Sequence, residues 1–348
     1  MTFKLSVFCT IPLIYAISVN AQNVSAPKWD EYRSPSAGDF LRAKKLSDKF
    51  NETWTYQFTL DNGTKAYINY ATLYIPGSGE KVGCDLSFWN FKGKSYSVGR
   101  QYPPERLKED RAKREINIKD EYFMNGTPGK GHHVFFSADK GGRFLVDLTF
   151  ESAVASLIPG SGVWKIGSEK YAQYILIPYG RVSGKIAHNG DTLTVKGYGY
   201  MEHTWQTAQA TDIAVRSLNF SANSAKKFYA GRIGFTKGGT PFGYAIMADS
   251  GKTKIVVPKS VTDNGQAYTG KTFPKGNIGI TWREGDAESL TFDMGHPQQK
   301  FSILNNFDGW FAQKAIKLMM GGEVFFYRGR SQGPDGSKLD WSVTGMQD

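Results

Sequence analysis

The chain has 348 residues, 39 of them glycine, and a formal net charge of +11. Its basic residues are spread along the chain. In the densest stretch, residues 106–115, they are mixed with acids, which indicates a solvated surface and argues against a nucleic-acid partner. The two cysteines are Cys9 and Cys84. Because Cys9 lies in the N-terminal apolar segment, no disulfide is expected, and the fold must be stabilised by its hydrophobic core alone. The length of the chain is enough for about two domains.

The first 21 residues have the pattern of a secretory signal peptide. Lys4 precedes an apolar run that ends at Val19, and a small-residue cleavage site ends at Ala21. Pro12 interrupts the run, which is also short for a membrane span. We therefore expect a secreted or otherwise extracytoplasmic protein that begins near Gln22 and is not stably inserted in a membrane.

Five Asn-X-Ser/Thr sequons occur in the chain, where random placement gives roughly two. This excess favours a glycoprotein of a eukaryotic secretory pathway and leaves a bacterial periplasmic origin open. The sequon asparagines are Asn23, Asn51, Asn62, Asn125 and Asn219.

A hairpin opens the regular part of the chain. Residues 51–60 alternate between apolar and polar side chains, with Trp54 and Tyr56 on the apolar face. The turn at residues 61–63 is Asp-Asn-Gly, and residues 65–75 return as a second strand. The pattern predicts the start of a β-meander.

Short strand-like runs bounded by glycine- or asparagine-containing turns continue to residue 344. Together with 14% aromatic residues, they predict an all-β fold of barrels or sandwiches. Turn residues near 160 and 178 divide the pattern into an N-terminal domain of residues 22–175 and a C-terminal domain of residues 176–348. Residues 310–320 have helical spacing and precede two glycines, which predicts one short helix near the C-terminus.

The stretch from Gly197 to Trp205 holds an acid, an imidazole, an indole and two phenols. Successive side chains of a strand point to opposite faces, so Tyr200 and Glu202 share one face while His203 lies on the other. A bulge at Gly199 would change this register. Glu202 and His203 are therefore expected to act separately and not as a dyad.

Two signatures resemble those of a known family. Glu52-Thr-Trp-Thr-Tyr56 before a hairpin resembles the acid-Trp-Trp-Tyr opening of a lipocalin-like family. Val182-Ser-Gly184, followed by the Gly197–Trp205 stretch, is similar to its second signature. The family includes carotenoid 1,2-hydratase (hydroxyneurosporene synthase), AttH-like proteins and fungal Diels–Alderase-like cyclases. The resemblance covers about residues 45–210 and implies two lipocalin-like β-barrel or sandwich domains around an apolar ligand cavity.

The resemblance also implies roles for the second signature. In the hydratases its carboxylate is implicated as the acid that protonates an alkene, beside an aromatic residue that supports the cation. Glu202 and Tyr200 match these positions, although Asp is usual at the first. His203 would polarise a carbonyl or orient Glu202. The implied activity is cofactor-independent hydration, isomerisation or cyclisation of an isoprenoid or polyketide-like molecule, with Glu202, His203 and Tyr200 as catalytic residues.

Aromatic side chains near the two signatures are the candidates for binding the apolar ligand, because their faces hold apolar or cationic groups. The alternative is that they fill the core of a barrel. These residues are Trp54, Tyr56, Tyr174, Tyr198 and Trp205.

A structural interpretation competes with the catalytic one. In it, Glu202 is a hydrogen-bonded carboxylate at the domain junction, His203 is a satisfied buried histidine, and the protein is a non-catalytic carrier. A glycan-binding β-sandwich is a second alternative, which the lack of a second carboxylate in the motif disfavours. No metal site is expected, because the adjacent His132 and His133 point to opposite faces of a strand.

Overall fold

The computed structural model describes most of the chain after the expected signal peptide, which lies outside the described residues, as does most of the helix expected at residues 310–320. The described part is residues 22–347 except 76, 224–226, 250–251, 268–275, 284–288, 295–296, 303, 305–309, 311–312, 315–316, 318–321, 333–335 and 337.

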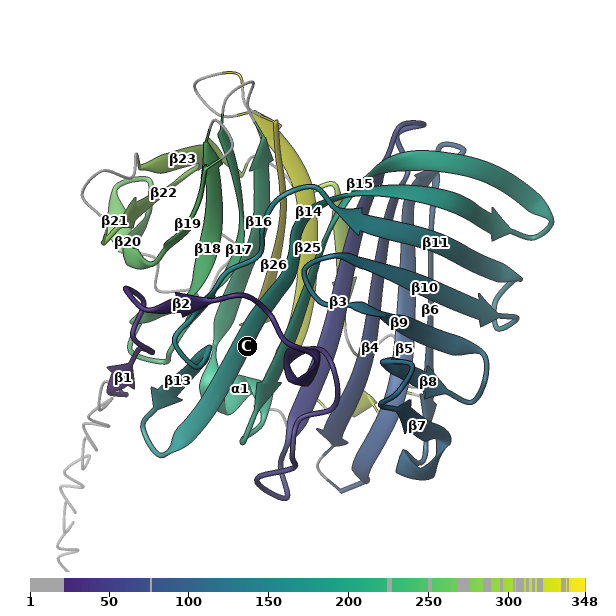
Figure 1. The fold of residues 1–348 in the computed structure, drawn as a ribbon, viewed down its shortest axis with the longest axis horizontal. Helices are drawn as coiled ribbons and strands as arrows, with labels where there is room; N and C mark the ends of the chain where they lie inside the picture. Colours follow the sequence, from purple (N-terminus) through teal and green to yellow (C-terminus); the bar gives the residue numbers. More distant parts are fainter. Residues whose placement is uncertain are drawn as a thin grey trace, which may run out of the picture.

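A 13-stranded antiparallel sheet forms the first half of the molecule and curls over its own inner face (Figure 1). Its strands are β1 (Val24–Ser25), β3 (Asn51–Leu60), β4 (Lys65–Ile75), β5 (Gly79–Phe91), β6 (Lys94–Tyr102), β7 (Leu107–Asp110), β8 (Glu115–Ile118), β9 (Tyr122–Thr127), β10 (Gly131–Ala138), β11 (Phe144–Ser152), β13 (Val163–Ile166), β14 (Glu169–His188) and β15 (Asp191–Gln206). Two short strands, β2 (Tyr32–Arg33) and β12 (Ile158–Pro159), pair beside it, and the 3-10 helices are η1 (Ala37–Asp39) and η2 (Pro104–Arg106).

The predicted hairpin is confirmed as β3 and β4, paired in antiparallel register. Every apolar side chain of the expected β3 face is buried, with Trp54 and Tyr56 fully enclosed. Gly63 in the turn has φ +84°, a conformation that favours glycine. The inner face of the curled sheet is packed with aromatic and aliphatic side chains, so burial of apolar area is the main force that stabilises this half.

The second half contains a seven-stranded and a four-stranded sheet that pack over a common core. The larger sheet consists of β16 (Arg216–Asn223), β17 (Lys227–Phe235), β18 (Pro241–Asp249), β19 (Lys252–Val256), β24 (Gln299–Ser302), β25 (Glu323–Gln332) and β26 (Lys338–Gln347). The smaller one consists of β20 (Pro258–Asp263), β21 (Gln266–Ala267), β22 (Asn277–Trp282) and β23 (Leu290–Asp293). The all-β class expected from the sequence is confirmed.

The change from one half to the other lies after Gln206, where β15 ends and the short helix α1 (Ala210–Ile213) begins. The division expected between residues 175 and 176 falls inside β14, a continuous strand of the first sheet. The turn residues there mark irregular pairing of β14 with β15, between Ile175 and Gly180, and the strand continues past them. The helical segments that the structure describes at full length are α1, η1 and η2. Of these, α1 lies at the junction of the two halves.

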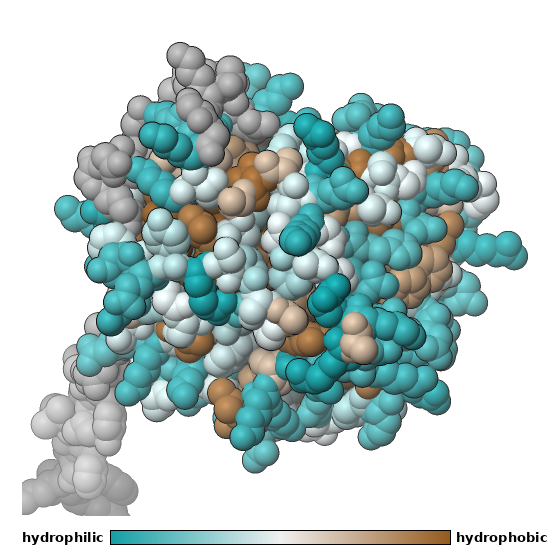
Figure 2. Space-filling model, in the orientation of Figure 1, coloured by the Kyte–Doolittle hydropathy of each residue, from teal (hydrophilic) through white to brown (hydrophobic). Residues whose placement is uncertain are grey.

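A third core cluster joins the two halves. It combines Tyr171 and Ile175 of β14 with Phe242 and Tyr244 of β18. The polar surface seen in Figure 2 carries apolar side chains only in small, separate areas. Among the described residues, no helix has the length and apolar composition to cross a membrane.

Candidate functional site

Strand β15 carries the second signature in the expected register. It pairs with β3 without interruption from Gly197 opposite Leu60 to Gln206 opposite Asn51, so no bulge occurs at Gly199 on this side. The irregularities lie on the β14 side. A Cβ at Gly199 would meet the Phe58 ring at 2.5 Å, which explains the glycine there. The expectation that Glu202 and His203 occupy opposite faces is confirmed by their partners.

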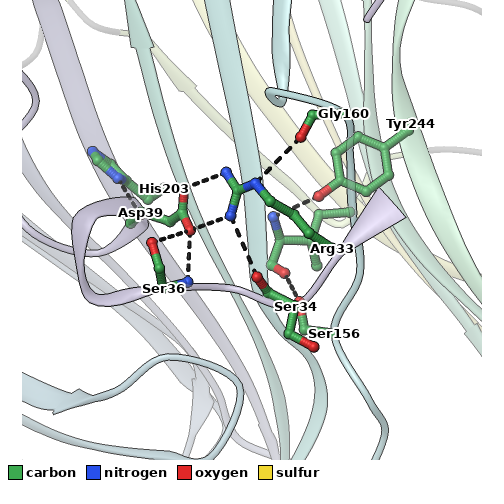
Figure 3. A network of polar contacts seen from close by, with 9 residues as sticks. Arg33, Ser34, Ser36, Asp39, Ser156, Gly160, His203 and Tyr244 are labelled. Atoms are coloured by element: carbon green, nitrogen blue, oxygen red, sulfur yellow. Dashed lines mark hydrogen bonds and ion pairs between the residues drawn. The ribbon is translucent and has the colours of Figure 1, made fainter. Parts of the chain in front are cut away.

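His203 faces the inside of the first half, where it is fully buried. Its ring is stacked on the indole of Trp54, with centroids 4.7 Å apart and planes 2° from parallel. Nδ1 lies 2.7 Å from the backbone oxygen of Asp39 (Figure 3). Nε2 lies 3.0 Å from Oε1 of Glu52. Each nitrogen thus faces an oxygen from a segment distant in sequence.

These contacts show where hydrogens must lie between His203, Asp39 and Glu52. The Asp39 carbonyl can only accept, so Nδ1 of His203 must carry a hydrogen. The contact between Nε2 and Glu52 then needs a second hydrogen, held either by the imidazole or by the carboxyl group. Glu52 Oε1 also accepts from the Ala43 backbone N–H at 2.6 Å. His203 and Glu52 therefore share one buried proton and form a structural tie.

The N-terminal strap, residues 32–43, closes over this tie. The guanidinium of Arg33 donates to both carboxylate oxygens of Asp39, at 2.6 and 2.7 Å, and its Nε donates to the Gly160 oxygen (Figure 3). The backbone N–H of Ser36 donates to Asp39 as well. Burial disfavours the charged form of Asp39, but the bonds from Arg33 and Ser36 outweigh it and lower the pKa of the carboxyl group. Asp39 is thereby held where its backbone oxygen meets His203.

Trp54 is tied to the same strap, because its Nε1 donates to the backbone oxygen of Phe40 at 2.6 Å. We predict that Trp54→Phe lowers the free energy of unfolding by about 1–3 kcal/mol, since a buried acceptor loses its donor. Urea unfolding monitored by circular dichroism measures this loss. Trp89→Phe, at a half-buried position of β5, is the control, and an equal loss in the two variants would contradict the prediction.

Glu202 lies on the opposite face, toward the second half, and is fully buried. Its Oε2 accepts from the Tyr200 hydroxyl at 2.8 Å. Its Oε1 accepts from Asn219 Nδ2 at 3.0 Å and from Arg232 Nε at 2.5 Å. Gln57 of β3 donates to Asn219 Oδ1 at 2.8 Å, which extends the network across the junction.

This arrangement favours an ionised carboxylate that orients an arginine. Burial opposes the charge of Arg232, but the nearby Glu202 outweighs burial and raises the pKa of the guanidinium. Asn219 is buried and uses both polar atoms of its amide in the network, so the folded structure has no room for a glycan at this sequon. Asn51, another sequon residue, is buried too.

A cleft of about 810 Å³ separates the two halves, and we call it the junction cleft. Outward-facing residues of β3, β4 and β5 line one side, and residues of β16, β17, β25 and β26 line the other. The volume is within the range of sites for small organic molecules. Its larger apolar and aromatic residues include Leu73, Tyr171, Trp205, Phe242, Phe301 and Phe326.

Positive charge dominates the lining of the cleft, in which Asp85 is the one acidic residue among those the structure describes. Arg232 is paired with Glu202, and Arg100 is paired with Asp139 at the surface. An anionic or oxygen-rich group of a ligand is therefore electrostatically favoured in the cleft. The basic residues of the lining are Arg100, Lys140, Arg216, Arg232 and Arg328.

The structure separates the aromatic residues expected to bind a ligand. Trp54, Tyr56, Tyr174 and Trp205 all belong to the core of the first half, and of these four only Trp205 also lines the junction cleft. The Tyr56 hydroxyl lies 3.0 Å from Nδ1 of the buried His132. A strand pattern distinguishes the two faces of a sheet, but it does not show which face borders a cavity and which is packed.

Tyr198 and Tyr200 are placed outside the cleft. Tyr198 is half-buried at the junction, with its hydroxyl 3.5 Å from Asp340, and Tyr200 packs in the cluster that joins the halves. Both line a much smaller pocket of about 20 Å³. Tyr200 reaches Glu202 through its hydroxyl, so these two predicted catalytic residues are in contact.

Sequence reasoning missed several residues of the site. Glu52 was visible as the acid of the first signature, and its contact with His203 links the two signatures. Asn219 was identified only as a sequon asparagine, and Arg232 and Arg328 belong to neither of the two signatures; the packing of the second sheet on the first brings all three to the junction.

The histidine pair behaves as the strand pattern predicts. His132 is buried, and burial lowers its pKa to about 3, whereas His133 is more exposed and lies 2.8 Å from Asp147. Within the described part of the chain, no group of three or more His, Cys, Asp or Glu residues is arranged to hold a metal ion.

The fold and the cleft define a class of protein: a two-part, all-β, lipocalin-like protein with a candidate small-molecule site at the junction. No protein-family model matches the chain, and no curated protein matches it in sequence. The comparison of structures is therefore the one that locates it among known proteins.

Particular proteins share this fold. An AttH-type protein from Nitrosomonas europaea aligns with a TM-score of 0.58 and 13% identity, over 92% of this chain and 99% of that one. CghA aligns with a TM-score of 0.55 and 14% identity, over 90% of this chain and 92% of that one. CghA in complex with Sch210972 aligns with a TM-score of 0.54 and 12% identity, over 92% of this chain and 97% of that one. The resemblance to AttH-like and Diels–Alderase-like proteins is confirmed at the level of the fold.

Proposed function

We propose that this protein binds a small molecule with an apolar, isoprenoid- or polyketide-like body in the junction cleft and serves as its carrier. The observation that carries the proposal is the cleft itself, with aromatic and aliphatic walls and a few converging polar groups. The complex of CghA with Sch210972 supports it, because that protein has the same fold. Export, directed by the signal peptide expected at residues 1–21, is part of this proposal.

The surroundings of Glu202 favour a carrier over an acid catalyst. A general acid must reach the substrate with a transferable proton. Glu202 is fully buried, does not line the cleft, and accepts hydrogen bonds from Tyr200, Asn219 and Arg232. We therefore assign Glu202 the role of a positioning residue, which holds Arg232 at the wall of the cleft.

Cofactor-independent hydration, isomerisation or cyclisation is the second candidate function, and the placement of Arg232 favours it. The guanidinium lines the cleft while Nε is held by Glu202, so its other N–H groups can polarise a ligand carbonyl. The test uses the natural ligand, extracted from the purified protein, and follows its conversion by mass spectrometry. Conversion by the wild-type protein but not by Arg232→Lys would favour this function over the carrier.

Nile red, a neutral apolar dye, tests the binding site. We expect the wild-type protein to bind it with a blue-shifted emission, and Thr55→Trp to weaken binding at least about tenfold. Thr55 lies in the middle of β3 and lines the cleft, so an indole there fills the space that the dye needs. Fluorescence titration gives the dissociation constants.

Thr149→Trp is the matched control. Thr149 is exposed on β11, outside the cleft, so the same substitution should leave dye binding unchanged. Untargeted extraction and mass spectrometry of the purified protein identify the natural ligand. If Thr55→Trp binds the dye as tightly as the wild type, the junction cleft is not the binding site.

A further inference from the structure

We propose that the junction cleft contains a subsite for a carboxylate group, formed by Arg328 on β25 stacked on Tyr67 of β4. The ligand is accordingly an amphiphilic organic acid, with its acidic end at Arg328 and its apolar body along the aromatic part of the cleft. This inference rests on the proposed binding function and adds the chemical class of the ligand.

The first observation is how Arg328 is held. Its guanidinium carbon lies 3.9 Å from the centroid of the Tyr67 ring, and Nη1 donates to Gln299 Oε1 at 3.3 Å. Both Arg328 and Tyr67 line the cleft. A stacked guanidinium keeps its planar edge of N–H groups free for acceptors in the plane, which is the geometry that a carboxylate matches with two parallel hydrogen bonds.

The second observation is what Arg328 lacks. Arg232 and Arg100 have carboxylate partners, but among the described residues Arg328 forms no ion pair. Burial lowers the pKa of its guanidinium, while Tyr67 and Asp85 act in the opposite direction. A desolvated cation without a paired anion is unfavourable, and a bound carboxylate would relieve that cost.

The third observation concerns the acid across from it. Asp85 of β5 lines the same part of the cleft, and its Oδ1 accepts from Asn69 Nδ2 at 3.1 Å. Burial raises the pKa of Asp85, against the effects of the Asn69 hydrogen bond and of Arg328. Asp85 is therefore a weak counter-ion, which repels a carboxylate when ionised and donates to it when protonated.

The apolar end of the ligand follows from the rest of the wall. Val324 and Phe326 precede Arg328 on β25, and Phe301 lies on the adjacent β24, all of them lining the cleft. Alternate residues of β25 thus place two apolar side chains and one cation in a row on one face. A molecule with an acid at one end of an apolar chain matches this row.

Dodecanoate and dodecanol, which differ in the charged group, test the subsite by isothermal titration calorimetry on the mature chain. We expect the wild type to bind dodecanoate at least about tenfold more tightly than dodecanol. Arg328→Gln should remove this preference, whereas Asp85→Asn should increase it, because the competing carboxylate is gone. Circular dichroism and the melting temperature establish that each variant is folded.

Arg330→Gln is the matched control: the same charge change on the same strand, at a residue that does not line the cleft. It should keep the preference for dodecanoate. Equal affinities of the wild type for the two probes, or the same loss in the Arg328 and Arg330 variants, would overturn the subsite. If Nile red binds in the cleft while the preference is absent, the proposed function stands and only the subsite fails; if no probe binds, both fail.

Discussion

Replacing Glu202 by Gln is expected to lower the free energy of unfolding by about 3 kcal/mol, because Arg232 then stays at the junction without its counter-ion. Glu202 is fully buried and the Arg232 side chain is only 23% exposed, so water in the cleft compensates for the lost carboxylate only in part. Gln is nearly isosteric with Glu and keeps an acceptor oxygen for Asn219, which limits the change to charge and hydrogen-bond polarity. Chemical unfolding at neutral pH measures the effect.

The double variant Glu202→Gln/Arg232→Met separates charge from packing. Removing both charges leaves no unpaired ion, so most of the lost stability should return. A Glu202→Gln protein with the stability of the wild type and no turnover of the natural ligand would contradict the structural role and restore the acid-catalyst hypothesis for Glu202.

The second large effect is expected at Asp340, where the substitution Asp340→Asn should lower the free energy of unfolding by about 3–5 kcal/mol. Asp340 of β26 accepts from Lys65 of β4, from Arg330 at 3.0 Å and from Thr59 at 3.0 Å, and so ties the second sheet to the first. Lys65 is almost fully buried beneath Trp89. The Asn variant leaves that ammonium without a carboxylate, and thermal and chemical unfolding report the loss.

The pH dependence of this tie has a defined sign. Burial opposes the charge of Asp340, but Lys65 and Arg330 outweigh it and lower the pKa of the carboxyl group. A depressed carboxyl pKa contributes stability above the unfolded value of about 3.9, and this contribution is lost as the pH falls through the folded value. The difference in stability between the wild type and Asp340→Asn should therefore shrink only below about pH 4.

Lys65→Met in the Asp340→Asn background is the control. It removes the stranded ammonium, which burial already disfavours, as the lowered pKa of Lys65 shows. Stability should partly recover. A single Asp340→Asn variant as stable as the wild type would show that the contact between the sheets is replaced by water.

The sequence by itself determined the local structure and the faces of its strands. Alternation in residues 51–60 and in the Gly197–Trp205 stretch is a property of the extended backbone, so it predicted the hairpin and placed Glu202 and His203 on opposite faces. The sequence predicted less well where the first half ends. The turn residues near 178 only disturb the pairing of β14 with β15, and β14 continues past them.

The tertiary structure alone decided which partners these residues meet. Glu202 meets Arg232, 30 positions later, and Lys65 meets Asp340, 275 positions later. Such pairs depend on how two sheets stack, and no local spacing encodes that. For the same reason the sequence could not distinguish Trp205, which packs in the core of the first half and also borders the cleft, from Trp54, which lies in that core without reaching the cleft. Both are aromatic residues of alternating strands, and only the packing of the second sheet leaves open space beside one of them.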